Sequence, residues 1–172
     1  MTLSAPTPKP FSLCEGAISE NDVWKPHLTV AAVVCRDDEY LFVRERIDGR
    51  SVLNRHEGHV EDGEGLIDAV VRETLEETAW DFRPESLVGV YRWRNPVSQE
   101  TFIRVCFSGR LLAHHPERSL DDGIEASVWL SPADLSGPNY SLRSPLVSRV
   151  VADHLSGQRY PLDILQDVEN FD

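Results

Sequence analysis

The chain has 172 residues, of which 41% are hydrophobic and 27% are charged. This length suits a single domain of roughly 100 to 200 residues, and the composition excludes collagen-like, coiled-coil and wholly disordered chains. The formal net charge of −12 disfavours binding to a nucleic-acid polymer or to an anionic membrane. A small anionic substrate remains compatible with this charge if a divalent cation reverses the local field.

Neither a membrane span nor a secretory signal is indicated by the sequence. The longest apolar run, residues 28 to 34, is far shorter than the roughly 18 residues of a membrane span. The first ten residues contain three prolines and no apolar core, unlike a secretory signal. Cys14, Cys35 and Cys106 are widely spaced, so neither a disulfide framework nor a cysteine zinc site is predicted. We therefore expect a cytoplasmic protein with reduced thiols.

The N-terminal half is predicted to open with a flexible arm and then a sheet. Residues 1 to 26 combine early prolines with polar residues that have no period, which is typical of an arm. Residues 28 to 34 read as a buried strand, followed by a turn at 36 to 39 and a hairpin partner at 40 to 43, and these two strands are expected to open a mixed sheet. Further strands are expected at residues 52–53, 87–93, 101–112 and 127–130.

Two longer helices are predicted from hydrophobic spacing and capping signals. Apolar residues recur every three or four positions over residues 66 to 78, which predicts an amphipathic helix. Ser131-Pro132 and Ser144-Pro145 each combine a capping residue with a proline suited to the first helical position. They predict a short helix near residue 134 and a longer one that ends before Gly157. The expected fold class is α+β, with a mixed sheet between helices.

Three glutamates gather on one face of the first helix. Glu73, Glu76 and Glu77 fall within about 100° of one another around the helix axis. Their repulsion, and their position near the C-terminal end of the helix dipole, make the cluster unfavourable unless a cation is bound. Oxygen ligands without nearby His or Cys suit Mg²⁺ or Mn²⁺. The alternative is an ordinary solvated acidic face.

The spacing around these glutamates carries a family resemblance. The pattern is Gly58, five residues, Glu64, seven residues, Arg72-Glu73, two residues, and Glu76-Glu77. It resembles the signature of the Nudix hydrolase superfamily. The flanking sequences Pro26-His27-Leu-Thr-Val, Leu142-Arg-Ser-Pro145-Leu-Val and Ser156-Gly-Gln-Arg-Tyr160-Pro-Leu are similar to the bacterial NudJ type of Nudix phosphatase. The resemblance covers about residues 25 to 165, with a domain at 27–160 and a C-terminal tail at 161–172.

Three departures from the family pattern lie in or near the signature. Thr74 stands where an aliphatic residue is usual, and its hydroxyl is expected to bond to a carbonyl one turn earlier. Ala79 replaces the usual glycine, so it either costs about 1 kcal/mol or extends the helix slightly. Arg55-His56-Glu57 stands where relatives commonly read Gln-Pro-Ala. Loss of the proline is expected to loosen this loop, and Glu57 to add charge beside the metal.

The resemblance implies an α/β/α sandwich with a loop-helix-loop metal site. Mg²⁺, with Mn²⁺ as a substitute, would be held by the Gly58 carbonyl and by Glu73, Glu76 and Glu77. The cation would polarise phosphate oxygens and lower the pKa of a water molecule. Glu73 is also a candidate for orienting or deprotonating that water. Glu64 and Arg72 are expected to brace the loop and orient a ligand glutamate.

Further site residues are expected outside the signature. Glu125, in the acidic segment 121–125, is the chosen extra ligand or base, with a solvated turn as the alternative. Arg44 and Arg104 are candidates for binding phosphate, although Arg104 is equally suited to a surface ion pair. Trp93 is a candidate for stacking on a base, whereas core packing is expected for at least one ring of the Tyr91 and Trp93 pair.

The expected activity is metal-dependent hydrolysis of phosphoanhydride bonds in nucleoside tri- and diphosphates or related pyrophosphates, by attack of water. One alternative keeps the chemistry but changes the substrate to ADP-ribose, an oxidised nucleotide or another nucleoside diphosphate derivative. Another is a non-catalytic nucleotide-binding Nudix module, against which the intact glutamate cluster argues. The expected partner is a small nucleotide or pyrophosphate. Monomer and homodimer both remain open.

Overall fold

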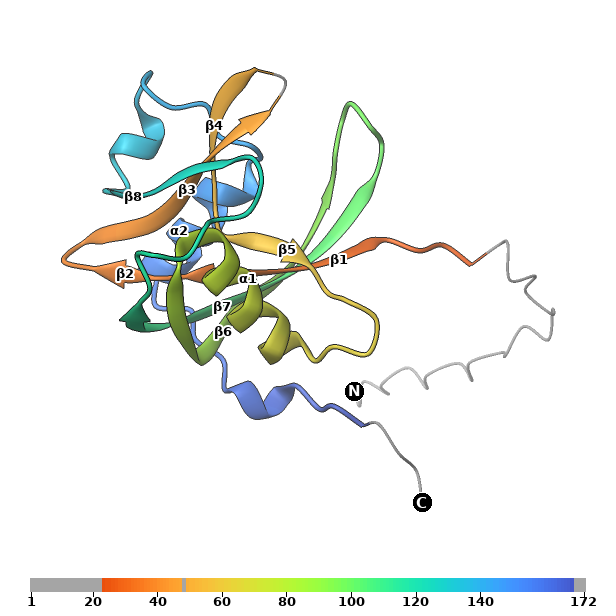
Figure 1. The fold of residues 1–172 in the computed structure, drawn as a ribbon. Helices are drawn as coiled ribbons and strands as arrows, with labels where there is room; N and C mark the ends of the chain where they lie inside the picture. The colour runs from red at the N-terminus through yellow and green to blue at the C-terminus, as the bar shows by residue number, and fades with distance from the viewer. Residues whose placement is uncertain (1–22, 48, 169–172) are drawn as a thin grey trace, which may run out of the picture.

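A computed structural model of the chain describes residues 23–47 and 49–168 (Figure 1). The predicted N-terminal arm therefore lies almost wholly outside the described residues, as does Cys14. Cys35 and Cys106 are both free thiols. No helix in the described part of the chain is long and apolar enough to cross a membrane.

The first sheet has four strands in the order β5-β1-β7-β6. They are β5 (Glu57–His59), β1 (His27–Val33), β7 (Thr101–His114) and β6 (Trp80–Arg94). β1 runs parallel to β7, whereas the β1–β5 and β6–β7 pairs are antiparallel. The predicted mixed sheet is confirmed, and β6 and β7 are longer than the strands predicted there.

A second, antiparallel sheet is built on β3 (Glu39–Ile47). β3 pairs with β2 (Cys35–Arg36), with β4 (Arg50–Asn54) and with β8 (Ile124–Leu130). In Figure 1 the β3–β4 hairpin and the β6–β7 hairpin both project toward the top of the molecule. The space between these hairpins is where the candidate site lies.

The predicted pairing of residues 28 to 34 with residues 40 to 43 forms only next to the turn, where the Leu41 N–H donates to the Val34 carbonyl at 3.1 Å. The turn itself forms, with Asp37 and Asp38 at φ 50° and 65°, as expected for a two-residue hairpin turn. It joins β2 to β3, however, whereas the neighbours of β1 are β5 and β7. Residues 30 to 34 are buried throughout, so their uniform apolar pattern does not encode which strand lies beside them.

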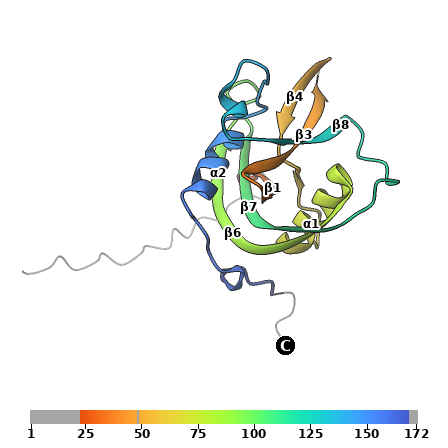
Figure 2. The same cartoon turned by 90° about the vertical axis from the view of Figure 1, so that its left-hand side faces the viewer.

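The helices cover opposite faces of the first sheet (Figure 2). α1 (Leu66–Thr78) matches the predicted helix, and α2 (Leu146–Leu155) follows the Ser144-Pro145 signal. A short 3₁₀ helix, η2 (Asp134–Ser136), follows the Ser131-Pro132 signal. Figure 2 shows α2 on one side of β1, β7 and β6 and α1 on the other, which is the expected sandwich.

Alternation along β1 divides the hydrophobic core into two clusters. Val30 and Ala32 pack in one cluster with Val70 of α1, whereas Ala31 and Val33 pack in the other with Val147 of α2. Successive side chains of a strand point to opposite faces of the sheet. β1 is therefore the central strand that fixes both helices, and α1 in turn places its glutamates beside β5.

The C-terminal half of α1 accommodates Thr74 and Ala79, the two residues at this end of the signature that differ from the family pattern. Thr74 Oγ1 donates a hydrogen bond to the Val70 carbonyl at 2.7 Å, which confirms the predicted bond one turn back. Ala79 ends the helix in the left-handed region at φ 57°, and its N–H donates to the Leu75 carbonyl. The helix is not extended, so an L-residue occupies a conformation that costs about 1 kcal/mol relative to glycine.

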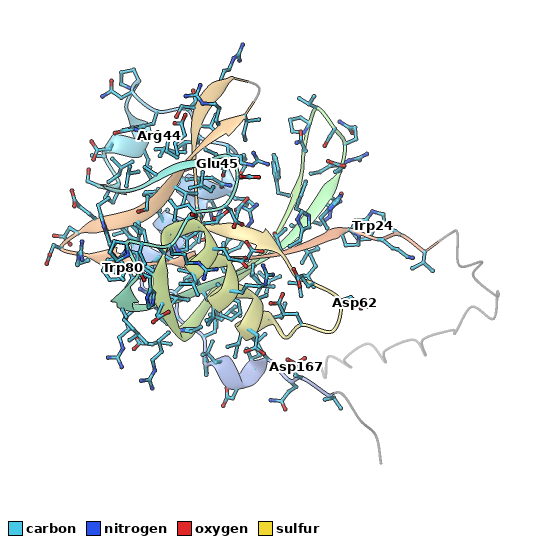
Figure 3. All side chains as sticks on the ribbon, in the orientation of Figure 1. Trp24, Arg44, Glu45, Asp62, Trp80 and Asp167 are labelled. Carbon is cyan, nitrogen blue, oxygen red and sulfur yellow. The ribbon has the colours of Figure 1, made fainter. Side chains whose placement is uncertain are left out.

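The described part of the predicted tail packs against the domain. Tyr160 and Leu87 exchange backbone hydrogen bonds at 2.8 Å. A 3₁₀ helix, η3 (Leu162–Ile164), follows, and Leu162 and Leu165 pack on the core cluster that contains Val70. Asp167 lies below the start of α1 (Figure 3). Residues 160 to 167 therefore close the lower side of the domain.

Candidate active site

A cleft of about 940 Å³ lies between the β3–β4 and β6–β7 hairpins. Its floor is formed by β1, β5 and β7, and the C-terminal end of α1 reaches it through Glu77. The lining combines acidic, basic and aromatic residues with aliphatic and neutral polar ones: Thr29, Glu45, Ile47, Arg50, Val52, Asn54, Glu57, Gly58, His59, Glu77, Trp93, Asn95, Val97, Phe102, Arg104, Leu142, Arg143 and Ser144. This is the size and chemistry of a site for a small anionic molecule that carries a ring.

Gly58 allows α1 to approach β5 closely. A Cβ atom at this position would lie 1.9 Å from the carboxyl carbon of Glu73, so any side chain would displace that carboxylate. The neighbouring Glu57 N–H donates to Glu77 Oε2 at 2.9 Å. β5 and the carboxylates of α1 therefore form one unit at the edge of the cleft.

Arg72 holds the glutamates of the signature. Its Nε and Nη2 donate to the two Glu64 carboxylate oxygens, each at 2.8 Å. Its Nη1 contacts Glu73 Oε1 at 2.7 Å and Glu76 Oε2 at 2.9 Å, and Nη2 also donates to the His59 carbonyl at 3.1 Å. The guanidinium therefore connects the loop to α1, which is the bracing geometry expected for Glu64 and Arg72.

Burial and like charge shift the pKa values of two of these carboxyls upward. Burial raises the pKa of Glu77 to about 9, and the neighbouring Glu45, Glu73 and Glu57 carboxylates add to the shift. Burial also raises the pKa of Glu73, which the Arg72 guanidinium partly offsets. The hydrogen bond from Arg72 instead lowers the pKa of Glu64. A bound cation would stabilise the ionised forms of Glu77 and Glu73 and so lower their raised pKa values.

The residues fit a hard divalent cation chemically, although they are not drawn together around one point. Among the residues described, no three His, Cys, Asp or Glu side chains are close enough to hold a metal ion as they stand. Glu73 and Glu76 are bound to Arg72, whereas Glu77 is bound to the Glu57 N–H. The donors are all oxygen atoms, which suits Mg²⁺ or Mn²⁺, and the space that a Cβ at residue 58 would fill is occupied by the Glu73 carboxylate.

Glu125 binds different partners from those of the signature glutamates. It forms ion pairs with Arg44 at 3.1 Å and with Arg46, and it accepts a hydrogen bond from Ser51 Oγ at 2.9 Å. Asp121 is the carboxylate of this segment whose charge acts on Glu73. Its N–H donates to the Glu76 carbonyl at 3.1 Å. Sequence reasoning named the segment but not Asp121, because only the fold shows which of its acids faces α1.

Two of the three predicted substrate-binding residues line the cleft, and the third, Arg44 of β3, does not. Trp93 and Arg104 line the cleft, and the Trp93 ring lies 5.7 Å from that of Phe102. Arg44 is paired with Glu125 instead. Tyr91 packs against the core and donates to Asp153 at 3.0 Å, so core packing of one ring of the pair is confirmed.

The segment before Gly58, for which the loss of the proline predicts a loosened loop, is buried. Arg55 and His56 are both 0% exposed. Arg55 Nη2 donates to the Val147 carbonyl at 3.2 Å, and the Ala32 N–H donates to the His56 carbonyl. Glu57 pairs with Arg104, so its charge is balanced locally. Arg55 Nε and both ring nitrogens of His56 are buried without a hydrogen-bond partner among the described residues.

Glu45 is a cleft residue that sequence reasoning did not identify. It follows Arg44 along β3 (Figure 3), so its side chain points to the opposite face of that strand. Its Oε2 pairs with Arg143 at 3.1 Å, and its charge is among those that raise the pKa of Glu77. The sequence signal that could have identified Glu45 is the alternation of charge along Arg44-Glu45-Arg46, which places Glu45 on the opposite face of the strand from its neighbours.

Comparison with known proteins identifies the family of this chain. Residues 25–150 match the NUDIX domain family. Phosphatase NudJ from Escherichia coli K12 is 35% identical over 145 residues, which cover 84% of this chain and 94% of that protein. A NUDIX hydrolase from Nitrosomonas europaea is 43% identical, with a TM-score of 0.81 over 84% of this chain and 98% of the other.

A more distant structure shows the same fold. The NUDIX domain of Shewanella oneidensis NrtR, solved with ADP ribose, has a TM-score of 0.60 at 16% identity, over 81% of this chain and 94% of that one. The chain described here belongs to the Nudix hydrolase family and is a hydrolase that acts on pyrophosphates. Members of this family generally use divalent cations and act on small nucleotides.

The raised pKa of Glu77 predicts a pH dependence of the metal-free protein. The folded state keeps a proton on Glu77 that the unfolded chain loses above its ordinary pKa, so the free energy of unfolding falls as pH rises toward about 9. Between pH 5 and pH 7 this group should contribute a fall of about 2 kcal/mol. Glu77→Gln removes that contribution, so the variant should become more stable than wild type as pH rises.

Urea denaturation in EDTA at pH 5, 6 and 7 measures this difference. Glu85→Gln is the matched control, because Glu85 is exposed and its ion pair with Arg110 lies outside the cleft. Its profile should run parallel to that of wild type. Parallel profiles for wild type and Glu77→Gln would refute the assignment of a strained, protonated Glu77.

Proposed function

We propose that this chain is a Mg²⁺-dependent phosphohydrolase of the NudJ type, which releases phosphate from nucleoside tri- and diphosphates or related pyrophosphates by attack of water. The observation that carries the proposal is the unit formed by Gly58, Glu73 and Glu77 at the edge of a cleft of about 940 Å³. It joins hard oxygen donors to a space large enough for a nucleotide. We place this activity in the cytoplasm.

The Gly58 carbonyl and Glu73, Glu76 and Glu77 would hold the Mg²⁺, for which Mn²⁺ would substitute. The bound cation would supply Lewis acidity toward phosphate oxygens and lower the pKa of a water molecule. If Glu73 and Glu76 held the cation, the other hydrogen bonds of Arg72, to Glu64 and to the His59 carbonyl, would still join the loop to the helix.

The chain's own groups would orient the substrate and the water. Glu73 is the candidate for orienting or deprotonating the attacking water, because its carboxylate lies against Gly58 at the edge of the cleft. Trp93, supported by Phe102, offers an aromatic face to a nucleobase. Arg104 and Arg44 remain the candidates for phosphate contacts, with Arg104 in the cleft and Arg44 outside it.

Release of phosphate and of pyrophosphate from a panel of nucleotides tests the function. The panel contains nucleoside tri- and diphosphates, ADP-ribose and an oxidised nucleotide, each with Mg²⁺, with Mn²⁺ and with EDTA. We expect metal-dependent orthophosphate release from many nucleotides, and Glu76→Gln should lower kcat on the order of a hundredfold or more. Glu85→Gln should retain wild-type activity.

Other outcomes of this panel would correct the proposal. Turnover of ADP-ribose or an oxidised nucleotide alone would keep the chemistry and change the substrate. Tight nucleotide binding without turnover by wild type would indicate a binding module instead of an enzyme. Undiminished turnover by Glu76→Gln would contradict the role of the glutamate cluster.

The segment 121–125 is proposed to supply one further carboxylate, with Glu125 and Asp121 as the candidates. Asp121 acts electrostatically on Glu73, whereas Glu125 is engaged by Arg44 and Arg46. We expect Asp121→Asn to lower kcat about tenfold or more and Glu125→Gln to change it less. Steady-state kinetics of the two variants decide between them, and the reverse order would make Glu125 the functional acid.

A further inference from the structure

The cleft contains a buried ion pair beside the signature, in which Arg104, a candidate for phosphate contacts, is already bound to Glu57. Arg104 of β7 and Glu57 of β5 form a two-pronged ion pair. Nη1 and Nη2 of Arg104 contact Oε2 and Oε1 of Glu57, respectively. Arg104 is 3% exposed and the Glu57 side chain is 10% exposed. Both line the cleft, so an entering substrate meets them as a pair and not as separate charges.

The pair is held in place from both sides. The Glu57 N–H donates to Glu77 Oε2 at 2.9 Å, which ties its backbone to the glutamate cluster. Arg104 Nε is 3.4 Å from Thr29 Oγ1 on the adjacent β1. A phosphate that recruited Arg104 would leave the Glu57 carboxylate buried without its partner, and removing one member of a buried pair is strongly unfavourable.

The other charges of the cleft do not provide a surplus of cations. Its lining contains three arginines, of which Arg104 pairs with Glu57 and Arg143 pairs with Glu45. Arg50 is the third, and Glu77 is the third carboxylate. When Glu77 is ionised, as it would be when it holds a cation, side-chain charges of opposite sign are equal in number along the lining. Each additional phosphate charge of a substrate is then unmatched by the protein.

We propose that Glu57 is a selectivity residue that, by occupying Arg104, makes the cleft prefer substrates with two phosphates over those with three. This inference rests on the proposed function and narrows its substrate class. Glu57 acts through Arg104 and through its own charge, so it is a positioning residue and not a catalytic one. Neutralising Glu57 frees one cation in the cleft for the additional phosphate of a triphosphate.

The ratio of kcat/KM for ATP to kcat/KM for ADP, measured with Mg²⁺, tests the proposal. Glu57→Gln keeps the size of the side chain and should raise this ratio roughly three- to tenfold, as expected for one charge acting on another at about 10 Å and an intermediate dielectric constant. The change should lie in the KM for ATP, with kcat altered by less than about twofold. A merely structural role would affect both nucleotides alike.

A double-mutant cycle identifies the pair as the cause. Arg104→Gln leaves Glu57 unpaired and should lower the ratio, whereas the Glu57→Gln/Arg104→Gln double variant should return it to within about twofold of wild type. Glu85→Gln, which removes an exposed ion-paired carboxylate outside the cleft, should leave the ratio unchanged. Thermal melting identifies any variant that fails to fold, in which case Glu57→Ala provides the same charge change.

The outcomes separate this inference from the proposed function. An unchanged or lowered ratio in folded Glu57→Gln would overturn the inference while leaving the hydrolase intact. If wild type hydrolyses no nucleotide, the proposed function fails, and calorimetric titration with tripolyphosphate and pyrophosphate in Mg²⁺ then tests the inference alone. Glu57→Gln should strengthen the binding of tripolyphosphate more than that of pyrophosphate, and an equal effect on both would overturn it.

Discussion

The arrangement of this molecule depends on keeping several carboxylates close together at the end of one helix. α1 cannot present Glu73 and Glu77 to β5 unless residue 58 lacks a side chain and unless a cation offsets the charge. Arg72 supplies that charge to Glu73 and Glu76 while gripping Glu64 in the preceding loop. The central strand β1 fixes α1 against the sheet, so the core and the acidic site are built on the same contact.

Two of the acidic side chains in the cleft are paired with arginines. The need to balance carboxylate charge therefore also affects how the cleft can receive an anionic substrate. Glu57 with Arg104 and Glu45 with Arg143 bring acidic groups near Glu77 without leaving their partners free. In the proposed function such a cleft would attract a phosphate mainly through a bound metal and would discriminate through the balance of fixed charges. Aromatic groups at Trp93 and Phe102 then offer contact area that does not depend on charge. In this proposal the aromatic residues contribute to binding, whereas the ion pairs determine selectivity.

Local periodicity was enough to predict α1 to the residue, the hydroxyl bond of Thr74 and the mixed sheet. It was not enough to predict the neighbours of β1, because a strand buried on both faces carries no alternation. The fixed spacing from Gly58 to Glu77 predicted the candidate site, and Gly58 and Glu77 both line the cleft. Asp121 and Glu45 were missed because their relation to α1 depends on contacts between distant segments. Arg55 and His56 were misjudged because polar residues are seldom completely buried.

The central claim is that the glutamates of α1 are strained without a cation and are relieved by one. Thermal unfolding of EDTA-treated protein, followed as Mg²⁺ is added up to about 10 mM, tests it most directly. We expect the Tm of wild type to rise with Mg²⁺, and the Tm of the Glu73→Gln/Glu77→Gln double variant to start higher and stay constant. A wild-type Tm that does not respond to Mg²⁺, or an equal rise in the double variant, would contradict the account.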